Sequence, residues 1–433
     1  MDPVPETEEP QGVASVVETT TPIPVQAAVT PPKPGMFAAF SVPNFRKYYV
    51  GQGLSLCGTW MQSVAQAWLV LELTDSAAMV GFVVAVQTLP VLLVGPFGGL
   101  IADRADKRSL LIVLQLVMGV LAAILAVLVL TEQVRLWQVF ALAFLLGSAD
   151  SFEKPARQAF IVEIVGPDTV RNAVSLNSVM VNGARVIGPA LAGVLIAAGG
   201  IGLCFALNAL SYLPVVALLI ALDVAALRPA PRQEPERGQL RAGFAYVRHT
   251  RALAVPLLMM AIIGCFTYEF QVTLPVLAQD TFDGSARTYG FMTAAMGLGA
   301  VAGGLYTAAR GSTGIRTLVR AAIGFGIVVL ATALAPTVEV ALVCLVLVGA
   351  SSVRVMAQGN TTVQLASDPQ MRGRVMALYL VAFLGTTPVG GPLVGWISNT
   401  LGPRWGLITG AVACFVAAGL GLFLRKPRPA AAS

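Results

Sequence analysis

The chain has 433 residues, of which 56% are hydrophobic and only 12% charged, whereas roughly a quarter of the residues in soluble domains carry a charge. A chain of this composition cannot cover its apolar side chains with a water-facing surface, which excludes a soluble enzyme or binding protein and indicates that lipid surrounds most of it. The net charge of +6 comes from basic residues dispersed over many loops, so nucleic-acid binding is not indicated.

The sequence contains no set of residues that is typical of a catalytic site. The chain has a single histidine, His249, and no phosphate-cradling G-x-x-x-x-G-K-S/T motif, so neither a Ser/His/Asp set nor ATP binding is indicated. Its five cysteines lie inside apolar segments without metal-like spacing, which is typical of small buried hydrophobic side chains. We therefore expect no enzyme activity, no metal and no cofactor.

Residues 1–44 begin acidic and continue rich in Pro, Thr and Val, without a helical period. Closely spaced prolines prevent regular structure, so we expect a disordered cytoplasmic tail, either passive or regulatory. We expect no signal peptide, because the first apolar segment, from near Phe45, is long enough to span a bilayer.

Twelve apolar segments follow, each about 20 residues or longer and so able to cross a bilayer as a helix. The predicted spans lie near 46–73, 77–101, 109–130, 136–158, 172–198, 202–222, 253–279, 288–309, 317–335, 338–359, 375–399 and 405–424. An arginine-rich linker at 223–252 divides them into bundles over 45–222 and 253–425, and a short cytoplasmic tail follows at 426–433. The predicted fold class is an all-α membrane protein with twelve transmembrane helices in two pseudo-symmetric six-helix bundles.

The distribution of basic residues predicts the orientation of these spans. With a cytoplasmic N-terminus, the cytoplasmic loops and tails hold most of the arginines and lysines, whereas the loops of the opposite side keep only Arg135, Arg287 and Arg404. Because Lys and Arg are enriched in cytoplasmic loops, we expect a multi-pass protein of the inner (cytoplasmic) membrane with both termini inside.

The two halves repeat weakly. Gly188 and Pro189 on the fifth span have counterparts in Gly391 and Pro392 on the eleventh, about 200 residues later, a spacing typical of six-plus-six transporters. Glycine and proline weaken a helix and permit close packing. These residues are predicted either to flex or seal the contact between the halves, or simply to kink their helices.

Polar side chains form stripes on two spans. The first span carries five of them at steps of three and four residues, and the fifth span repeats the pattern. They are Gln52, Ser55, Thr59, Gln62 and Gln66 on the first span, and Ser178 and Asn182 on the fifth. Because polar groups facing lipid cost free energy, the stripes are predicted to line a watery cavity, or else to form hydrogen bonds between helices.

Several charges lie within the predicted spans. Arg185 is deep in the fifth span, where an unpaired charge costs a few kcal/mol. We predict Asp150 and Glu153 of the fourth span as its partners, in a structural ion pair or in a set that exchanges a proton. Glu269 in the seventh span is a candidate for proton coupling, unless it lies near enough to the surface to be hydrated. Arg354 in the tenth span is a further intramembrane charge.

The loop at 98–108 places five charges within six residues, directly after the small residues Gly98, Gly99 and Ala102. Asp103 lies four residues after Gly99 and so on the same helical face. Its carboxylate could accept hydrogen bonds from the exposed amides at the start of a neighbouring helix. We predict a cytoplasmic gate here, with a simple orienting turn as the alternative.

Several motifs resemble a known family. The spacing G-x-x-x-D-R-x-x-K-R at Gly99–Arg108 resembles the loop between helices two and three of the major facilitator superfamily. Several segments are similar to the branch of that superfamily that contains enterobactin exporters and macrolide-efflux proteins; they are Phe45–Gln52, Gly58–Gln62, Ala65–Leu71, Pro155–Phe160, Asn182–Pro189 and Phe270–Pro275. The resemblance extends over about 45–425.

This resemblance implies a proton-driven exporter of small amphipathic molecules (drugs, antibiotics, siderophores or secondary metabolites) that works by alternating access. It adds Thr273 to the cavity and Arg104, Arg108 and Arg157 to the gate. The alternatives are an importer or uniporter of the same fold, or a non-transporting scaffold or receptor. We expect the substrate, protons and the bilayer as partners, without nucleic acid or ATP, and function as a monomer.

Overall fold

The computed structural model describes residues 37–228, 239–309, 313–368 and 370–424, with the side chains of 95–104, 239–243, 308, 309 and 384 left outside the description. All regular structure within these ranges is helical. A bilayer imposes this outcome, because a helix satisfies its backbone N–H and C=O groups internally.

The first half contains a short 3-10 turn and five long helices. They are η1 (Ala38–Ser41), α1 (Pro43–Thr74), α2 (Ala77–Arg104), α3 (Lys107–Leu130), α4 (Leu136–Val165) and α5 (Val170–Ile220). Helix α5 contains both the fifth and the sixth predicted spans, and its backbone turns at Gly200, where φ is 78°. A side chain would strain this conformation, so glycine suits the turn between the two spans.

The second half is more interrupted. Its elements are α6 (Gln239–His249), α7 (Arg251–Phe266), α8 (Phe270–Val276), the π-helical turn η3 (Leu277–Thr281), α9 (Ala286–Ala309), α10 (Ile315–Ala333), α11 (Val338–Ala366), α12 (Arg372–Leu384), α13 (Thr387–Leu401) and α14 (Pro403–Phe423). The seventh predicted span is broken into α7, α8 and η3, and the eleventh into α12 and α13.

Counting α5 as two crossings and each broken span as one gives the twelve predicted crossings. Eight helical runs in the described part, α5 among them, are long and apolar enough to cross a membrane by length and composition alone. Helices α1, α4 and α9 complete the set.

Ordered structure begins earlier than the sequence predicted. The expected tail extends to residue 44, but Ala39 is fully buried and its N–H donates to Asn172 Oδ1 at 2.8 Å. The ring of Phe40 packs edge-on against Tyr49, with centroids 4.9 Å apart. These contacts fix η1 on the first half, and the remainder of the predicted tail, residues 1–36, lies outside the described residues.

The predicted linker at 223–252 also contains more structure than expected. It includes a short 3-10 turn, η2 (Val224–Ala226), and helix α6. The hydroxyl of Tyr246 on α6 donates to Asp368 Oδ2 at 2.8 Å. The linker helix is thereby attached to the end of α11.

The two halves use the same packing device. In the first half, Gly188 of α5 lies against the carbonyl oxygen of Cys57 on α1, and in the second half Gly390 of α13 lies against the carbonyl oxygen of Cys265 on α7. Glycine is required at both positions because a Cβ would overlap the facing backbone. In both halves, the helix of the fifth or eleventh span is therefore in backbone contact with the helix of the first or seventh span.

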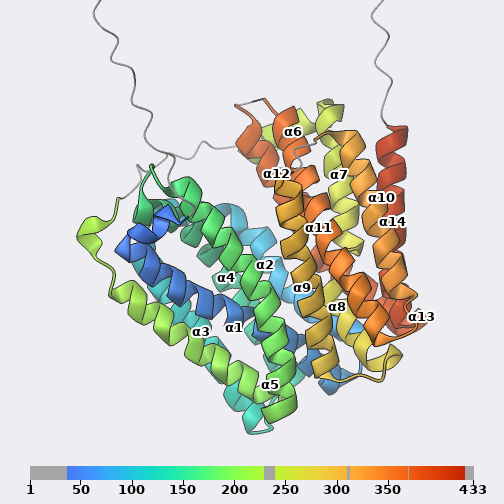
Figure 1. Ribbon diagram of the computed structural model, residues 1–433, viewed down its shortest axis with the longest axis horizontal. Helices are drawn as coiled ribbons and strands as arrows, with labels where there is room; N and C mark the ends of the chain where they lie inside the picture. The colour runs from blue at the N-terminus through green and yellow to red at the C-terminus, as the bar shows by residue number, and fades with distance from the viewer. Residues whose placement is uncertain (1–36, 229–238, 310–312, 369, 425–433) are drawn as a thin grey trace, which may run out of the picture. The chain divides into compact units, whose positions relative to one another are not determined.

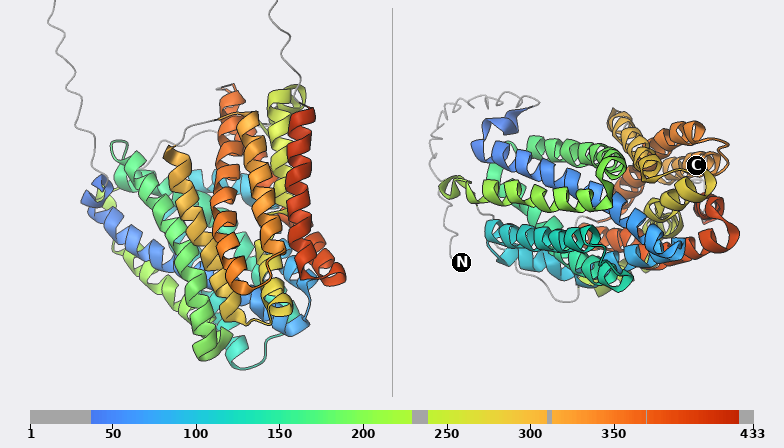
Figure 2. Two further views of the ribbon diagram at one scale, coloured as in Figure 1. Left: turned by 45° about the vertical axis from the view of Figure 1, so that its right-hand side comes forward. Right: turned by 90° about the horizontal axis from the view of Figure 1, so that it is seen from below.

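The halves meet through α2 against α13 and α5 against α9. Figure 1 shows α1, α3, α4 and α5 gathered on one side and α7, α10, α11 and α14 on the other, and the same division is visible in Figure 2. At the two crossings Gly81 faces Gly391, and Gly193 faces Gly290.

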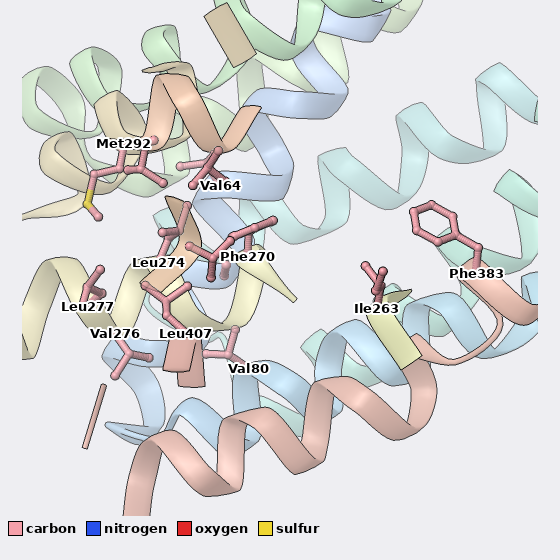
Figure 3. Packing of buried hydrophobic residues seen from close by; sticks show 14 of the residues in the cluster. Val64, Val80, Ile263, Phe270, Leu274, Val276, Leu277, Met292, Phe383 and Leu407 are labelled. Atoms are coloured by element: carbon pink, nitrogen blue, oxygen red, sulfur yellow. The ribbon is translucent and has the colours of Figure 1, made fainter. Parts of the chain in front are cut away.

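Apolar side chains continue the core from one half into the other. A single buried cluster includes Val64 and Val80 from the first half and Phe270, Leu274 and Leu407 from the second, as Figure 3 shows. Val64 lies near the end of α1 and Val80 near the start of α2, so these contacts lie toward the membrane face opposite the start of α1. At that face the two halves are therefore in contact.

A glycine exchange tests the contact between α7 and α13. Gly390→Ala should destabilise the protein, because the new methyl group overlaps the carbonyl of Cys265. Gly324→Ala on α10 is the matched control, since nothing lies within 4 Å of its added Cβ. Alanine there should be neutral or stabilise the helix by up to about 1 kcal/mol. Thermal unfolding of the purified variants in detergent checks this, and equal melting temperatures would contradict it.

Candidate transport site

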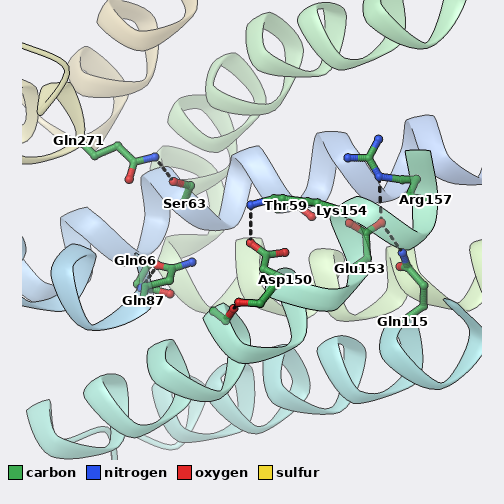
Figure 4. A network of polar contacts seen from close by, with 12 residues as sticks. Thr59, Ser63, Gln66, Gln87, Gln115, Asp150, Glu153, Lys154, Arg157 and Gln271 are labelled. Atoms are coloured by element: carbon green, nitrogen blue, oxygen red, sulfur yellow. Dashed lines mark hydrogen bonds and ion pairs between the residues drawn. The ribbon is translucent and has the colours of Figure 1, made fainter. Parts of the chain in front are cut away.

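Helices α1, α3 and α4 share a buried polar network, drawn in Figure 4. Arg157 Nε donates to Glu153 Oε1 at 2.9 Å, and both side chains are buried. Gln115 Nε2 donates to the same oxygen at 3.4 Å, and Ser55 Oγ donates to Gln115 Oε1 at 3.3 Å. The network satisfies a buried ion pair with neutral donors, and it joins three helices of the first half.

The predicted pairing of Arg185 with Asp150 and Glu153 is wrong. Glu153 pairs with Arg157, and Asp150 accepts from Lys154 Nζ at 2.9 Å. Both pairs are spaced i, i+4 on α4, where side chains lie on one helical face and meet without help from another helix. The spacing of both pairs is visible in the sequence and is the local signal that predicts them. Arg157, predicted at the gate, belongs to this buried pair.

Arg185 instead lies against an aromatic ring. Its guanidinium carbon is 4.8 Å from the ring centroid of Trp60 on α1. Its Nε is buried and has no hydrogen-bond partner among the described residues. The backbone of Gly297 on α9 packs against the Arg185 carbonyl, so the arginine lies beside the contact between the halves. A planar cation stacked on a ring, with a donor to spare, can bind an anionic group.

The polar stripe on α1 makes hydrogen bonds to neighbouring helices. Asn208 Nδ2 donates to Gln62 Oε1 at 2.5 Å, and Gln66 Nε2 donates to Gln87 Oε1 at 3.2 Å. Thr59 and Tyr212 hydroxyls are 3.4 Å apart. The alternative interpretation, hydrogen bonds between helices, thus describes these side chains in this structure. Gln52 and Ser55 of the same stripe are also buried.

The polar residues predicted on α5 are more exposed than those on α1 and, among the described residues, do not bond to other helices. Ser178 is exposed and Asn182 half-buried, and each side chain donates to a carbonyl of its own helix, at 3.0 and 2.8 Å. Arg354 on α11 is exposed. The structure does not bring these three side chains into the α1 network.

Glu269 is deeply buried, which overturns the alternative of a hydrated surface residue. Its side chain is 3% exposed, and it stands in the break between α7 and α8. Thr267 Oγ1 donates to the Gly410 carbonyl at 2.8 Å, and Tyr268 OH donates to the Ser352 carbonyl at 2.6 Å. These bonds hold the unwound segment, while Thr273 Oγ1 donates to the Glu269 carbonyl at 3.2 Å.

The carboxyl of Glu269 lies at the crossing of α2 and α13. Its Oε2 is next to Gly391, which itself faces Gly81. Its Oε1 is buried without a hydrogen-bond partner in the described part of the chain. An acid at a contact between the halves, on a broken helix, occupies the kind of position where transporters bind coupling ions.

Further polar contacts between the halves were not predicted. Asn399 at the end of α13 accepts from the Ala77 N–H at 2.7 Å and donates to Ser76 Oγ at 2.8 Å, so it caps the start of α2. Gln271 Nε2 donates to Ser63 Oγ at 2.8 Å. No short-range sequence signal marks these pairs, because Asn399 and Ala77 are 322 positions apart.

The predicted gate loop is described only in part. Helix α2 extends through Gly99, Asp103 and Arg104, but their side chains lie outside the described residues. Arg108 donates from Nε to the Leu219 carbonyl and from a terminal nitrogen to the Ile220 carbonyl, both at 2.8 Å. A cation at a helix C-terminus is stabilising, so Arg108 caps α5.

Helical backbone continues through the predicted flexing residues. Within α5, the backbone angles are non-helical at Gly200. Gly188 and Pro189 therefore do not interrupt the helix. Gly391 and Pro392 likewise lie inside α13, whereas the break in the eleventh span lies earlier, at Gly385–Thr386. In this structure both glycines serve close helix packing.

Twelve crossings in two related halves, with unpaired intramembrane polar groups at their contact, define a secondary transporter of the major facilitator type. The chain belongs to the transmembrane secretion effector family of that superfamily, whose model matches residues 34–433. It is thus a multi-pass membrane transporter and not an enzyme.

Two curated relatives are transporters named for siderophores. The chain is 26% identical to the enterobactin exporter EntS of Escherichia coli O1:K1 over 389 residues, covering 88% of this chain and 90% of that one. It is also 26% identical to the staphyloferrin A transporter of Staphylococcus aureus over 260 residues, covering 59% of this chain and 64% of the relative.

Solved transporters share the fold. A bacterial homologue of the lysosomal transporter Spinster, in an inward-facing conformation, superposes with a TM-score of 0.67 at 13% identity, covering 88% of this chain and 96% of that one. The POT family transporter PepTSo gives a TM-score of 0.70 at 12% identity, covering 88% of this chain and 97% of that one. At these identities the likeness shows the fold alone.

The two ion pairs on α4 should differ in their contribution to stability. Glu153→Gln leaves the buried Arg157 without its counter-ion, which should cost about 3–5 kcal/mol. Asp150→Asn should cost less than about 1 kcal/mol, because the side chain of its partner Lys154 is 53% exposed. Denaturant unfolding of the two variants checks this, and equal losses would show that burial does not set the difference.

Asn399 should hold the halves together. Asn399→Ala removes the cap of α2, so we expect a larger population with the halves separated at that face. Spin labels at the exposed residues Leu73 and Leu401, in a variant without the native cysteines, would report the distance between the two halves at that face. Thr400→Ala is the control, because Thr400 is exposed and its hydroxyl bonds carbonyls of its own helix. Unchanged distances in Asn399→Ala would show that the cap does not hold this face.

Proposed function

We propose that this protein exports an anionic amphipathic small molecule, of the siderophore type, across the inner membrane in exchange for protons. Membership of the transmembrane secretion effector family and the similarity to the enterobactin exporter support export. The similarity to the staphyloferrin A transporter supports a siderophore-like substrate. Both termini are cytoplasmic in this proposal, as the distribution of basic residues predicts.

With this orientation, the contacts between the halves close the outer face, and the structure corresponds to a state that loads substrate from the cytoplasm. Alternating access then requires α2 to separate from α13 and α5 from α9. At both crossings glycines bring the two helix backbones into direct contact. Such a contact is either fully formed or lost. This all-or-none contact suits a two-state transporter.

The position of Glu269 is the observation that carries the proton-coupling proposal. A carboxylate buried without a cationic partner is costly, and Glu269 lies where α2 meets α13. Loss of its proton to the cytoplasm would leave a negative charge at this contact, which favours separation of the halves. Return of a proton from the outside would neutralise the carboxyl and allow the halves to close again. One proton then moves inward for each outward passage.

Arg185 supports the anionic character of the substrate. Its guanidinium faces Trp60 and keeps a buried donor without a partner in the described residues. A carboxylate or phenolate of the substrate would supply the missing acceptor, and the indole ring would contact its apolar part. Arg185 also lies beside the moving contact of α5 and α9, so binding there can influence whether the halves separate.

Transport in everted membrane vesicles tests the function. We expect uptake of labelled enterobactin or a related anionic siderophore when the vesicle interior is acidic. Glu269→Gln should abolish the gradient dependence, while exchange of labelled for unlabelled substrate persists. Glu339→Gln is the control, because Glu339 is exposed in the first turn of α11. Transport that does not depend on the proton gradient would contradict proton coupling. Accumulation of the substrate by intact cells would indicate an importer. If none of the compounds is transported, a scaffold is favoured.

Arg185→Gln should weaken the binding of anionic substrates by about tenfold or more, since a hydrogen bond to a charged group contributes roughly 1.5–3 kcal/mol. Neutral amphipathic compounds should be affected much less. Competition assays with matched anionic and esterified compounds measure both effects. Equal weakening for the two classes would mean that Arg185 has only a structural role.

A further inference from the structure

A cavity separate from the polar groups at the contact of the halves lies within the second half. Its volume is about 550 Å³, within the range of small-ligand sites. Four helices surround it: α7 and α10 where they begin, and α11 and α14 where they end. Because these four ends share one membrane face, the cavity opens at the level of lipid headgroups. Most of its lining is apolar, including Val255, Pro256 and Leu365.

The mouth of this cavity is positively polarised. Arg251 lines it, together with the first residues of α7 and α10. The N-cap residues are Thr250, whose side chain accepts no hydrogen bond from α7, and Gly314, which has no side chain. Among the described residues, the first N–H groups of Ala252 and Ile315 therefore have no capping side chain. Two uncapped helix N-termini and a guanidinium together favour an anion with several oxygen acceptors.

Deeper in the cavity, a polar group has no partner. The side chain of Thr362 on α11 lines the cavity, is 8% exposed, and its hydroxyl makes no hydrogen bond to any described residue. Threonine hydroxyls in helices commonly bond a carbonyl of the preceding turn, as those of Thr293 and Thr332 do here. A buried hydroxyl without a partner is costly, and a ligand with an oxygen acceptor below its headgroup would satisfy it.

We propose that this cavity binds an anionic phospholipid. The phosphate lies between the starts of α7 and α10 against Arg251, a glycerol-ester oxygen accepts from Thr362, and an acyl chain fills the apolar part. Location supports a lipid rather than a free anion, since the mouth faces the headgroup region and the interior is apolar. Basic clefts between transmembrane helices at this depth suit anionic headgroups.

Native mass spectrometry of the full-length protein with added phosphatidylglycerol tests the proposal. Phosphatidylcholine with the same acyl chains is the neutral comparison, and glycerol phosphate represents the headgroup alone. We expect one saturable site that prefers phosphatidylglycerol and is not competed by glycerol phosphate. Equal binding of the two lipids would overturn the proposal, and efficient competition by glycerol phosphate would indicate an anion site instead.

Substitutions of cavity residues test whether the lipid binds in this cavity. Arg251→Gln should weaken phosphatidylglycerol binding about tenfold, whereas Arg251→Lys should retain the preference. Arg372→Gln, which removes an exposed charge at the same membrane face, should leave binding unchanged. Thr362→Val should weaken both lipids, because their ester groups are alike. Equal losses in Arg251→Gln and Arg372→Gln would show a general charge effect, and an unchanged affinity in both Arg251→Gln and Thr362→Val would place the lipid elsewhere.

Discussion

Backbone contact between helices at glycine is the constraint on which the rest of this structure depends. In a bilayer, apolar side chains gain little by leaving lipid for a neighbouring helix, so close van der Waals packing has to hold the helices together. Gly188 against Cys57 and Gly390 against Cys265 provide it within the halves, and Gly81 against Gly391 provides it between them. These contacts also determine where the charges lie, since Gly391 packs beside the Glu269 carboxyl.

Two groups of charged side chains in the helices differ in their chemistry. Glu153 with Arg157, and Lys107 with Glu163, form buried pairs with N–O distances of 2.9 and 2.7 Å. The first pair lies within α4, whereas the second joins the start of α3 to α4. Arg185 and Glu269 lie instead beside the contacts between the two halves, each with a polar atom unsatisfied among the described residues. This contrast, rather than charge alone, supports a transport role for the second group.

The interruptions of the second half have a related cause. Where α7 gives way to α8, the hydroxyls of Thr267 and Tyr268 donate to carbonyls of α14 and α11. Their bonds tie the unwound segment to its own bundle. Glu269 can therefore lie at the surface of the second half that meets α2, without loss of the helix packing behind it. A broken helix within a bilayer is tolerated only with this kind of support.

Length and hydropathy indicated a membrane protein with twelve crossings, because burial in lipid acts on each segment locally, and a weak repeat in the sequence indicated two related halves. The i, i+4 pairs on α4 were equally local, and the spacing of Glu153 and Arg157 predicts their bond. The tertiary structure decided the rest. It placed Arg185 on Trp60, buried Glu269 at the crossing of α2 and α13, and used Asn399 to cap α2. Those contacts join residues of different helices, up to 322 positions apart, and depend on how helices approach one another, which hydrophobicity and spacing along one helix do not encode.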